Sequence, residues 1–292
     1  MKKRTKSGLI FDILNILLMI LLCVAMIFPF WTILMTSLVS SQEFYARSLI
    51  LWPWNFYLGA YKGVLTNPDI LRSIGLTVFI TVVGTAYSMI MTLALAYGLS
   101  KNRIILSKFF RTLVVITMYF SAGLVPYYLL IRNLGLRNSI WVMIIPIGVS
   151  AWNYIVVRSF FMELPASLEE SATIDGANDL QIFARIVLPL SGPVIATFTL
   201  FYGVGYWNQW WNAMLFITNQ NLYPLQYVLR NMVASSADGL KVLQNFAASN
   251  NKAFEEGTKM ATVFVATIPI VCVYPFLQKY FAKGVMIGAI KG

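Results

Sequence analysis

Residues 73–100 read SIGLTVFITVVGTAYSMIMTLALAYGLS and contain no charged side chain. A helix needs roughly 17 to 25 mainly apolar residues to cross the hydrocarbon layer of a bilayer. The stretch is long enough for one crossing, so it predicts a membrane-spanning helix.

The rest of the chain has the same character, since 59% of its 292 residues are hydrophobic and its mean hydropathy is +0.72. A soluble chain of this composition would have too little polar surface to cover itself, so lipid is the solvent for most of it. The long apolar run 186–229 contains an aromatic and amide cluster at 206–212, which is typical of the water interface, and we assign it one span. We predict an all-α integral membrane protein with a single transmembrane domain and six transmembrane helices, at about 13–38, 73–100, 112–131, 138–157, 190–216 and 260–278.

Basic residues predict the orientation of the spans. They gather before the first span, in the connection between the second and third, and after the last: Lys2, Lys3, Arg4, Lys6, Lys101, Arg103, Lys108, Arg111, Lys279, Lys283 and Lys291. Such segments are cytoplasmic by the positive-inside rule, so both termini are expected inside. Residues 158–185 then form a cytoplasmic loop and residues 218–258 a long extracytoplasmic one, which we expect could reach a partner outside the membrane.

Composition also argues against several functions. The net charge of +11 could suggest nucleic acid, but the bases cluster at helix ends, where they meet anionic lipid headgroups. No charged residue lies in the central part of any predicted span and the chain has no histidine, so proton relays and ion sites lack their usual groups. No metal site or catalytic group is expected, and Cys23 and Cys272 are interpreted as small core hydrophobes. The chain also lacks a G-x-x-x-x-G-K-[ST] loop, so we expect it to bind no ATP itself.

The cytoplasmic loop carries the strongest local signals. Pro165 marks a helix start, Ser167 with Glu170 has the spacing of a capping box, and Gly176 is a natural left-handed stop. These residues predict a short helix at about 166–175.

A second helix is expected to begin at Asn178 or Asp179 and to run into the fifth span, with Pro189 and Pro193 bending or breaking it. A short rigid helix joined through a glycine elbow to a spanning helix can transmit a push from a partner protein. The alternative is a solvated amphipathic loop that lies on the membrane surface.

The loop has the spacing E-x-A-x3-G-x9-I-x-L-P, formed by Glu170, Ala172, Gly176 and 186–189. This pattern resembles the signature loop of ABC importer permeases, which docks onto the ATPase, although Ser171 stands where Ala is usual. Other segments are similar to the sugar-importer permeases related to the smaller maltose permease, in the branch for oligosaccharides and uronate-containing sugars. They are Ser150-Ala-Trp-Asn153, Ile174-Asp-Gly-Ala177, Gly205-Tyr-Trp-Asn208, Tyr223-Pro-Leu225 and Lys283-Gly-Val-Met-Ile-Gly288.

The resemblance implies a type I ABC importer permease in the bacterial inner membrane. The implied partners are a second homologous permease, two ATPase subunits that carry ATP and Mg, and an extracytoplasmic sugar-binding protein. Coupling would pass through residues 165–189. Carried onto this sequence, the ATPase-docking residues are Glu169, Glu170, Ser171, Ala172, Asp175, Gly176 and Asp179.

Sugar contacts are expected from aromatic rings and amides, because rings pack on the C–H faces of sugars and amides pair with hydroxyls. The candidates for the substrate pathway are Tyr202, Tyr206, Trp207, Asn208, Trp211 and Asn212. The alternative is an interfacial aromatic belt with helix packing. A membrane-embedded enzyme or an ion-coupled secondary transporter is the remaining alternative for the whole chain. This sequence lacks the charged groups that either of them would need.

Overall fold

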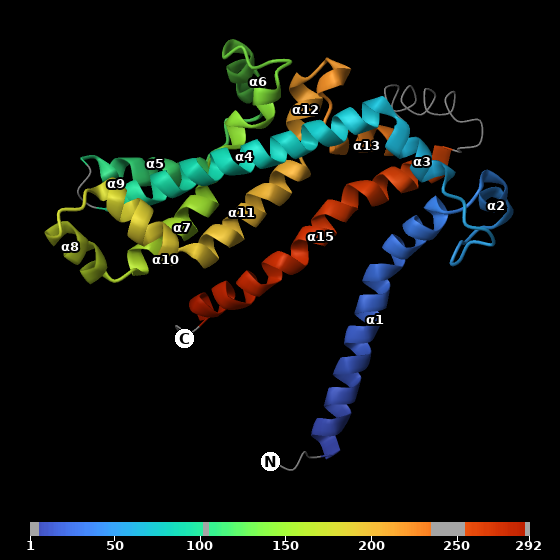
Figure 1. Cartoon of the computed structure of the whole chain (residues 1–292), viewed down its shortest axis with the longest axis horizontal. Coiled ribbons are helices and arrows are strands. Elements are labelled where there is room, and N and C mark those ends of the chain that lie inside the picture. The colour runs from blue at the N-terminus through green and yellow to red at the C-terminus, as the bar shows by residue number, and fades with distance from the viewer. Residues whose placement is uncertain (1–5, 102–104, 235–254, 290–292) are drawn as a thin grey trace. The chain divides into compact units, whose positions relative to one another are not determined.

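The computed structural model describes residues 6–101, 105–234 and 255–289 (Figure 1). The basic residues Lys2, Lys3, Arg4, Arg103 and Lys291, and most of the long loop at 235–254, lie outside the described residues. Within the described ranges all regular structure is helical, in agreement with the predicted class.

The longer helices are α1 (Lys6–Ser37), α4 (Pro68–Ser100), α5 (Ser107–Tyr119), α6 (Leu124–Asn133), α7 (Ala151–Glu163), α11 (Gly192–Trp207) and α15 (Glu255–Ala289). The shorter helices are α2 (Ser41–Ala46), α3 (Gly59–Thr66), α8 (Ala166–Ile174), α9 (Asp179–Ile182), α10 (Leu188–Leu190), α12 (Trp211–Phe216) and α13 (Leu225–Val233). Irregular turns complete the set: η1 (Ile140–Met143), η2 (Ile145–Ile147), the π-helix η3 (Phe183–Val187) and η4 (Gln220–Leu222).

The described helices offer fewer unbroken spans than the sequence predicts. Three of them are long and apolar enough to cross a membrane, at Gly8–Ser37, Pro68–Ser100 and Glu255–Val273. Two bent pairs raise the number to five if each pair is one span: Ile140–Ile147 with Ala151–Glu163 at 46°, and Asp179–Leu190 with Gly192–Trp207 at 84°. The predicted span at 112–131 is instead divided between α5 and α6, neither of which is long enough alone. The count of six therefore stays a prediction.

The chain divides into two compact units, the first made of Met1–Leu71 with Leu229–Ile268 and the second of Arg72–Val228 with Pro269–Gly292. In the first unit α1 is apolar on every side and none of its spanning window is buried. Cys23 on α1 and Cys272 on α15 are free and exposed, so the interpretation as core residues is wrong. A helix that is apolar all round gives no sequence signal for which face turns inward.

A small cap follows α1 in the first unit. Met35, Val39 and Ile50 form its buried cluster, and the buried carboxylate of Glu43 accepts hydrogen bonds from Arg47 Nη1 at 3.0 Å and from the backbone N–H of Trp54 at 2.8 Å. These bonds satisfy a charge that would be costly to bury alone.

Tyr61 joins α3 to the end of α1 through a 2.7 Å hydrogen bond with Ser37. Burial raises the pKa of the Tyr61 phenol above its ordinary value, although the bond to Ser37 lowers it in part. The phenol therefore remains neutral at physiological pH and keeps this hydrogen bond.

The core of the second unit lies where α4, α11 and the η1–η2 segment meet. The hydroxyl of Tyr206 on α11 bonds Ser88 Oγ of α4 at 2.8 Å and donates to the carbonyl of Ile144 at 3.1 Å. Gly84 on α4 makes room for this ring, since a Cβ there would lie 2.5 Å from a Tyr206 ring carbon. Helix α7 packs on α5 and on α11 within the same unit.

Candidate functional site

Helix α8, in the loop predicted to be cytoplasmic, begins one residue after Pro165, as predicted, but without the predicted capping box. Ser167 is the second residue of the helix, so it cannot serve as the N-cap, and its carbonyl instead accepts from Ser171 Oγ at 2.8 Å. The capping box lies at the next helix start. There Asn178 and Gln181 exchange side-chain to backbone hydrogen bonds, both at 2.9 Å.

The glycine elbow after α8 is confirmed. Gly176 has φ +83°, a left-handed conformation that favours glycine. Its N–H donates to Thr173 O at 3.0 Å and the N–H of Ala177 donates to Ala172 O at 2.9 Å, which is the Schellman arrangement. The elbow therefore ends α8 with its last carbonyls satisfied and turns the chain toward α9.

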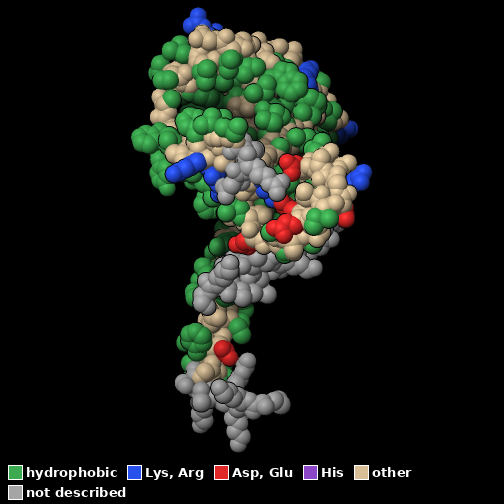
Figure 2. Space-filling view, turned by 90° about the vertical axis from the view of Figure 1, so that its left-hand side faces the viewer, with side chains coloured by type: hydrophobic (Ala, Val, Ile, Leu, Met, Phe, Trp, Pro, Cys, Tyr) green, Lys and Arg blue, Asp and Glu red, His purple; other side chains and the backbone are tan. Residues whose placement is uncertain are grey.

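The surface of the α8–α9 segment carries both acidic side chains and highly exposed apolar side chains. Ile174 is 86% exposed and Leu180 is 74% exposed. Of the predicted docking residues, Glu170, Ser171, Asp175, Gly176 and Asp179 are exposed and Ala172 is half-buried. Figure 2 views the molecule from the side on which Figure 1 shows α8, and acidic side chains gather on this face.

Glu169 departs from the other predicted docking residues because it faces the helical bundle. Its carboxylate forms an ion pair with the ammonium group of Lys101, just after the end of α4, and its side chain is only 22% exposed. From the sequence, Lys101 is predicted only to contribute to membrane orientation through its charge. No local spacing could reveal this pair, since its members are 68 residues apart.

The segment that joins α8 to the membrane is continuous but sharply bent. After α9 the chain passes through the π-helix η3 and α10, and Ser191 then donates its hydroxyl to Val187 O at 2.6 Å. The axis turns by 84° before α11 begins at Gly192. The predicted break near Pro189 and Pro193 is confirmed, because proline removes the backbone donor that a straight helix needs.

The candidate pathway residues separate into two groups. Tyr202, Tyr206 and Asn212 are buried within the second unit. The Tyr202 hydroxyl bonds Thr92 Oγ1 at 2.6 Å and accepts from the N–H of Ser150 at 3.1 Å. These groups already have protein partners, so their polar atoms are occupied in this conformation.

The two amides, Asn208 and Asn212, and the two tryptophans, Trp207 and Trp211, also differ in how far each is bonded or exposed. Asn212 donates to Val142 O at 3.1 Å and accepts from the Tyr127 hydroxyl at 3.2 Å. Asn208 and Trp211 are exposed, whereas Trp207 is buried, with 7% of its surface exposed, and borders a groove. Of the six candidates, Asn208 and Trp211 therefore have the open surface that a ligand could reach.

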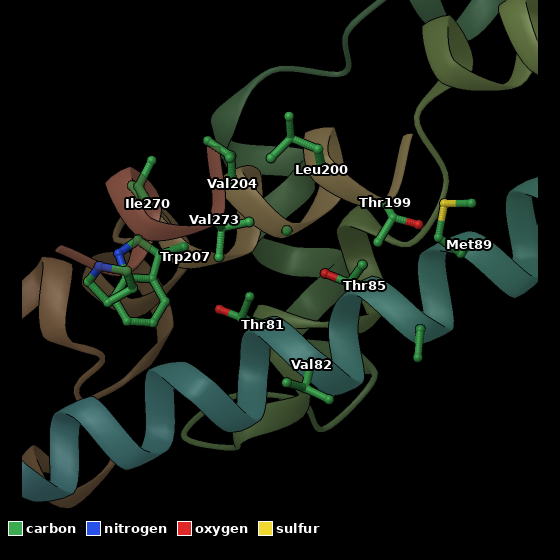
Figure 3. A pocket seen from close by; sticks show the side chains of 13 residues that line it. Thr81, Val82, Thr85, Met89, Thr199, Leu200, Val204, Trp207, Ile270 and Val273 are labelled. Carbon is green, nitrogen blue, oxygen red and sulfur yellow. The ribbon is translucent and has the colours of Figure 1, made fainter. Parts of the chain in front are cut away.

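The groove next to Trp207 has a volume of about 570 Å³ and lies between α4, α11 and the second-unit part of α15 (Figure 3). Its walls are mostly apolar, but the hydroxyls of Thr81 and Thr85 on α4 have no hydrogen-bond partner among the described residues. Thr199 and Gly203 on the facing α11 complete the polar and narrow part of the lining. These threonines are not among the candidates predicted from sequence, although a spacing of four residues places Thr81 and Thr85 on one face of α4.

No group of three or more His, Cys, Asp or Glu that could hold a metal ion occurs in the ranges that the structure describes. The groove combines the hydroxyls of Thr81 and Thr85 with mostly apolar walls. Within the described ranges we find no clustered acid, base and nucleophile of the kind that a catalytic centre requires.

Residues 8–287 match the family described as the binding-protein-dependent transport system inner membrane component. The chain is 42% identical to Protein LplC of Bacillus subtilis, over 99% of this chain and 97% of the relative. It is also 42% identical to the polygalacturonan/rhamnogalacturonan transport system permease protein YtcP of Bacillus subtilis, over the full length of both.

A solved structure shows the same fold. It is a chain of a bacterial ABC transporter involved in the import of the acidic polysaccharide alginate, with a TM-score of 0.89 and 32% identity, covering 96% of this chain and 100% of that chain. Family and fold thus agree along nearly the whole sequence.

Proposed function

The chain belongs to the family of binding-protein-dependent transport system inner membrane components, and we propose that it imports an oligosaccharide that contains uronate sugars, driven by a separate ATPase that docks on α8. The observation that carries the docking proposal is the exposed α8–α9 segment, which turns at the left-handed Gly176 and presents Ile174 and Leu180 to solvent. Exposed apolar side chains that gather on one segment mark a surface that a protein can cover. The acids beside them add a charge pattern that a basic groove on an ATPase can recognise.

The proposed substrate class is supported by the relatives. YtcP carries the name of a polygalacturonan and rhamnogalacturonan system, and the matching solved chain comes from an importer of alginate. All of these are acidic polysaccharides, whereas a more distant relative, 28% identical, carries the name of a melibiose, raffinose and stachyose permease. The higher identities favour an acidic oligosaccharide over a neutral one.

A second permease subunit is part of the proposal. The spanning part of α1 is not buried within this chain, so lipid or another protein must cover it. We propose that a homologous permease provides part of that cover and the other half of the pathway. Both termini are proposed to be cytoplasmic, with an extracytoplasmic binding protein on the opposite side. ATP and Mg would be bound by the ATPase subunits alone.

The decisive experiment reconstitutes this chain with its partner permease, the ATPase and the binding protein in liposomes. We expect oligogalacturonides delivered by the binding protein to stimulate ATP hydrolysis and to be taken up, with maltooligosaccharides as the neutral control. Equal stimulation by both sugars would overturn the substrate proposal. Failure of the ATPase to copurify with the permease pair would overturn the docking proposal.

A further inference from the structure

Glu169 and Lys101 connect α8 to the end of α4, two elements that are far apart in sequence. Both charged side chains are mostly covered, at 22% and 30% exposed. A pair so placed is less screened by water than one on an open surface. The ion pair also turns the Glu169 carboxylate toward the bundle and away from the surface that an external partner could contact.

The pair lies on an aromatic cluster that ties three elements together. Lys101 Nζ is 5.1 Å from the ring centroid of Tyr97, one helical turn earlier on α4. The buried Tyr97 ring stacks on Phe183 of η3, with centroids 4.8 Å apart and planes at 27°. The same ring meets Phe161 of α7 edge to face at 6.3 Å. Tyr97 therefore contacts the segments on both sides of α8 along the chain.

A backbone contact strengthens the same end of α4. Arg158 on α7 donates its Nε–H to the carbonyl of Leu99 at 3.0 Å. That carbonyl belongs to the last turn of α4, where carbonyl groups lack partners within the helix. The cytoplasmic end of α4 is thus fixed to α7 and to η3, and through Lys101 to α8.

The chain itself attaches α8 at its two ends, near Pro165 and at Gly176, and two attachments leave rotation about the line that joins them unfixed. A third, side-chain attachment removes that freedom, because three contacts on different elements define an orientation. Helix α4 is continuous from Pro68 to Ser100, and at 1.5 Å per residue Thr85 lies about 18 Å along it from Tyr97. A displacement at α8 therefore reaches the wall of the groove through one rigid helix.

We infer that the Lys101–Glu169 pair is a latch inside this chain that couples movement of α8 to α4, and that Glu169 is a positioning residue and not an ATPase contact. The inference rests on the proposed function, since it assumes that the ATPase moves α8. It divides α8 by face, with Glu169 turned toward α4 and Glu170, exposed, available to the ATPase.

Charge reversal separates the two roles of these neighbouring acids. In the full reconstituted complex, Lys101→Glu and Glu169→Lys should each lower sugar transported per ATP hydrolysed by roughly fivefold, while the double reversal should restore it. Lys101→Arg keeps the cation and should stay near wild type, which controls for misfolding. The matched control is Glu170→Lys, which Lys101→Glu should not rescue.

The results that contradict the latch are distinct from those that contradict docking. The latch is wrong if the double reversal transports no more sugar per ATP than the combined losses of the two single variants predict. It is also wrong if Lys101→Glu transports a normal amount of sugar per ATP. If instead Glu170→Lys hydrolyses and transports normally at normal abundance, it is the docking face that is wrong.

A second measurement needs no ATPase. In the permease pair with Cys23 and Cys272 replaced by serine, Lys101→Cys with Glu169→Cys should be joined by a short thiol crosslinker within one chain. The matched pair Lys101→Cys with Glu170→Cys should react much less. Equal reaction of both pairs would overturn the geometry on which the latch depends.

Discussion

Replacing Tyr206 by Phe tests whether this ring supports the bundle or contacts the substrate. The side chain is 2% exposed, and its hydroxyl bonds Ser88 Oγ and Ile144 O. Tyr206→Phe keeps the ring that fills the space left by Gly84 and removes both hydrogen bonds, so the change isolates the hydroxyl.

The magnitude follows from the two lost bonds. Side-chain hydrogen bonds between membrane helices contribute about 0.6 kcal/mol on average and at most about 1.7 kcal/mol each. Losing both, and leaving a buried carbonyl with one partner fewer, is expected to cost about 1 to 3 kcal/mol. At about 2 to 4 °C for each kcal/mol, the apparent melting temperature should fall by about 2 to 12 °C. Tyr206→Ala also empties the ring volume, and its cost should rise to about 3 to 5 kcal/mol.

The assay is thermal unfolding of the purified complex, followed by size-exclusion profile, together with sugar uptake per folded molecule. Tyr119 on α5 is 78% exposed, so Tyr119→Phe is the matched control and should leave both quantities unchanged. We expect Tyr206→Phe to lower stability and to leave uptake per molecule near wild type. Unchanged stability with a loss of uptake would refute the structural reasoning and return Tyr206 to the substrate pathway.

Three further predictions concern the elbow, the orientation and the groove. Gly176→Pro should leave the protein inserted but lower substrate-stimulated ATP hydrolysis at least tenfold, because proline cannot adopt φ +83°. Normal hydrolysis at normal abundance would contradict the role of the elbow in coupling. Cysteines at the exposed positions Ser167 and Ser48, in a chain without native cysteines, should react with an impermeant reagent from the cytoplasm and from outside respectively, and labelling both from one side would refute the orientation. A Cβ at Gly203 would lie 3.7 Å from Thr85 Oγ1, which is an ordinary contact, so the Gly203→Val variant should fold and fill the groove. It should lower uptake severalfold while the ATPase still copurifies. Unchanged uptake would exclude the groove from the pathway.

The features that could be predicted from sequence are those set by neighbouring residues. Gly176 stops α8 because a left-handed residue closes a helix without strain, and Asn178 begins α9 because its side chain can accept the orphan N–H groups. The capping box at Ser167 failed for an equally local reason. Pro165 starts the helix so early that Ser167 falls inside it.

The features that could not be predicted depend on residues distant in the chain. An aromatic ring with a hydroxyl suits a sugar site and a helix interface equally well. The hydrogen bond to Ser88, 118 residues away in the chain, shows that Tyr206 belongs to the interface. The same holds for Glu169, which shares its charge and its segment with Glu170. Apolar composition predicted the three long apolar helices α1, α4 and α15, but it left open which sides of α1 and α15 turn outward.

The positions of the latch and the elbow have a joint consequence for how the groove can change shape. From α8, one route passes along the chain through Gly176 and the bent segment into α11, and the other passes through Lys101 into α4. These two helices form facing walls of the groove, with Gly203 on one and Thr85 on the other. The first route contains a π-helix and an 84° bend, whereas the second enters a continuous helix. We therefore expect the same push on α8 to move the two walls by different amounts. A difference between facing walls is what opens or closes a groove, and loss of either route should therefore lower the sugar transported per ATP hydrolysed without preventing the ATPase from docking.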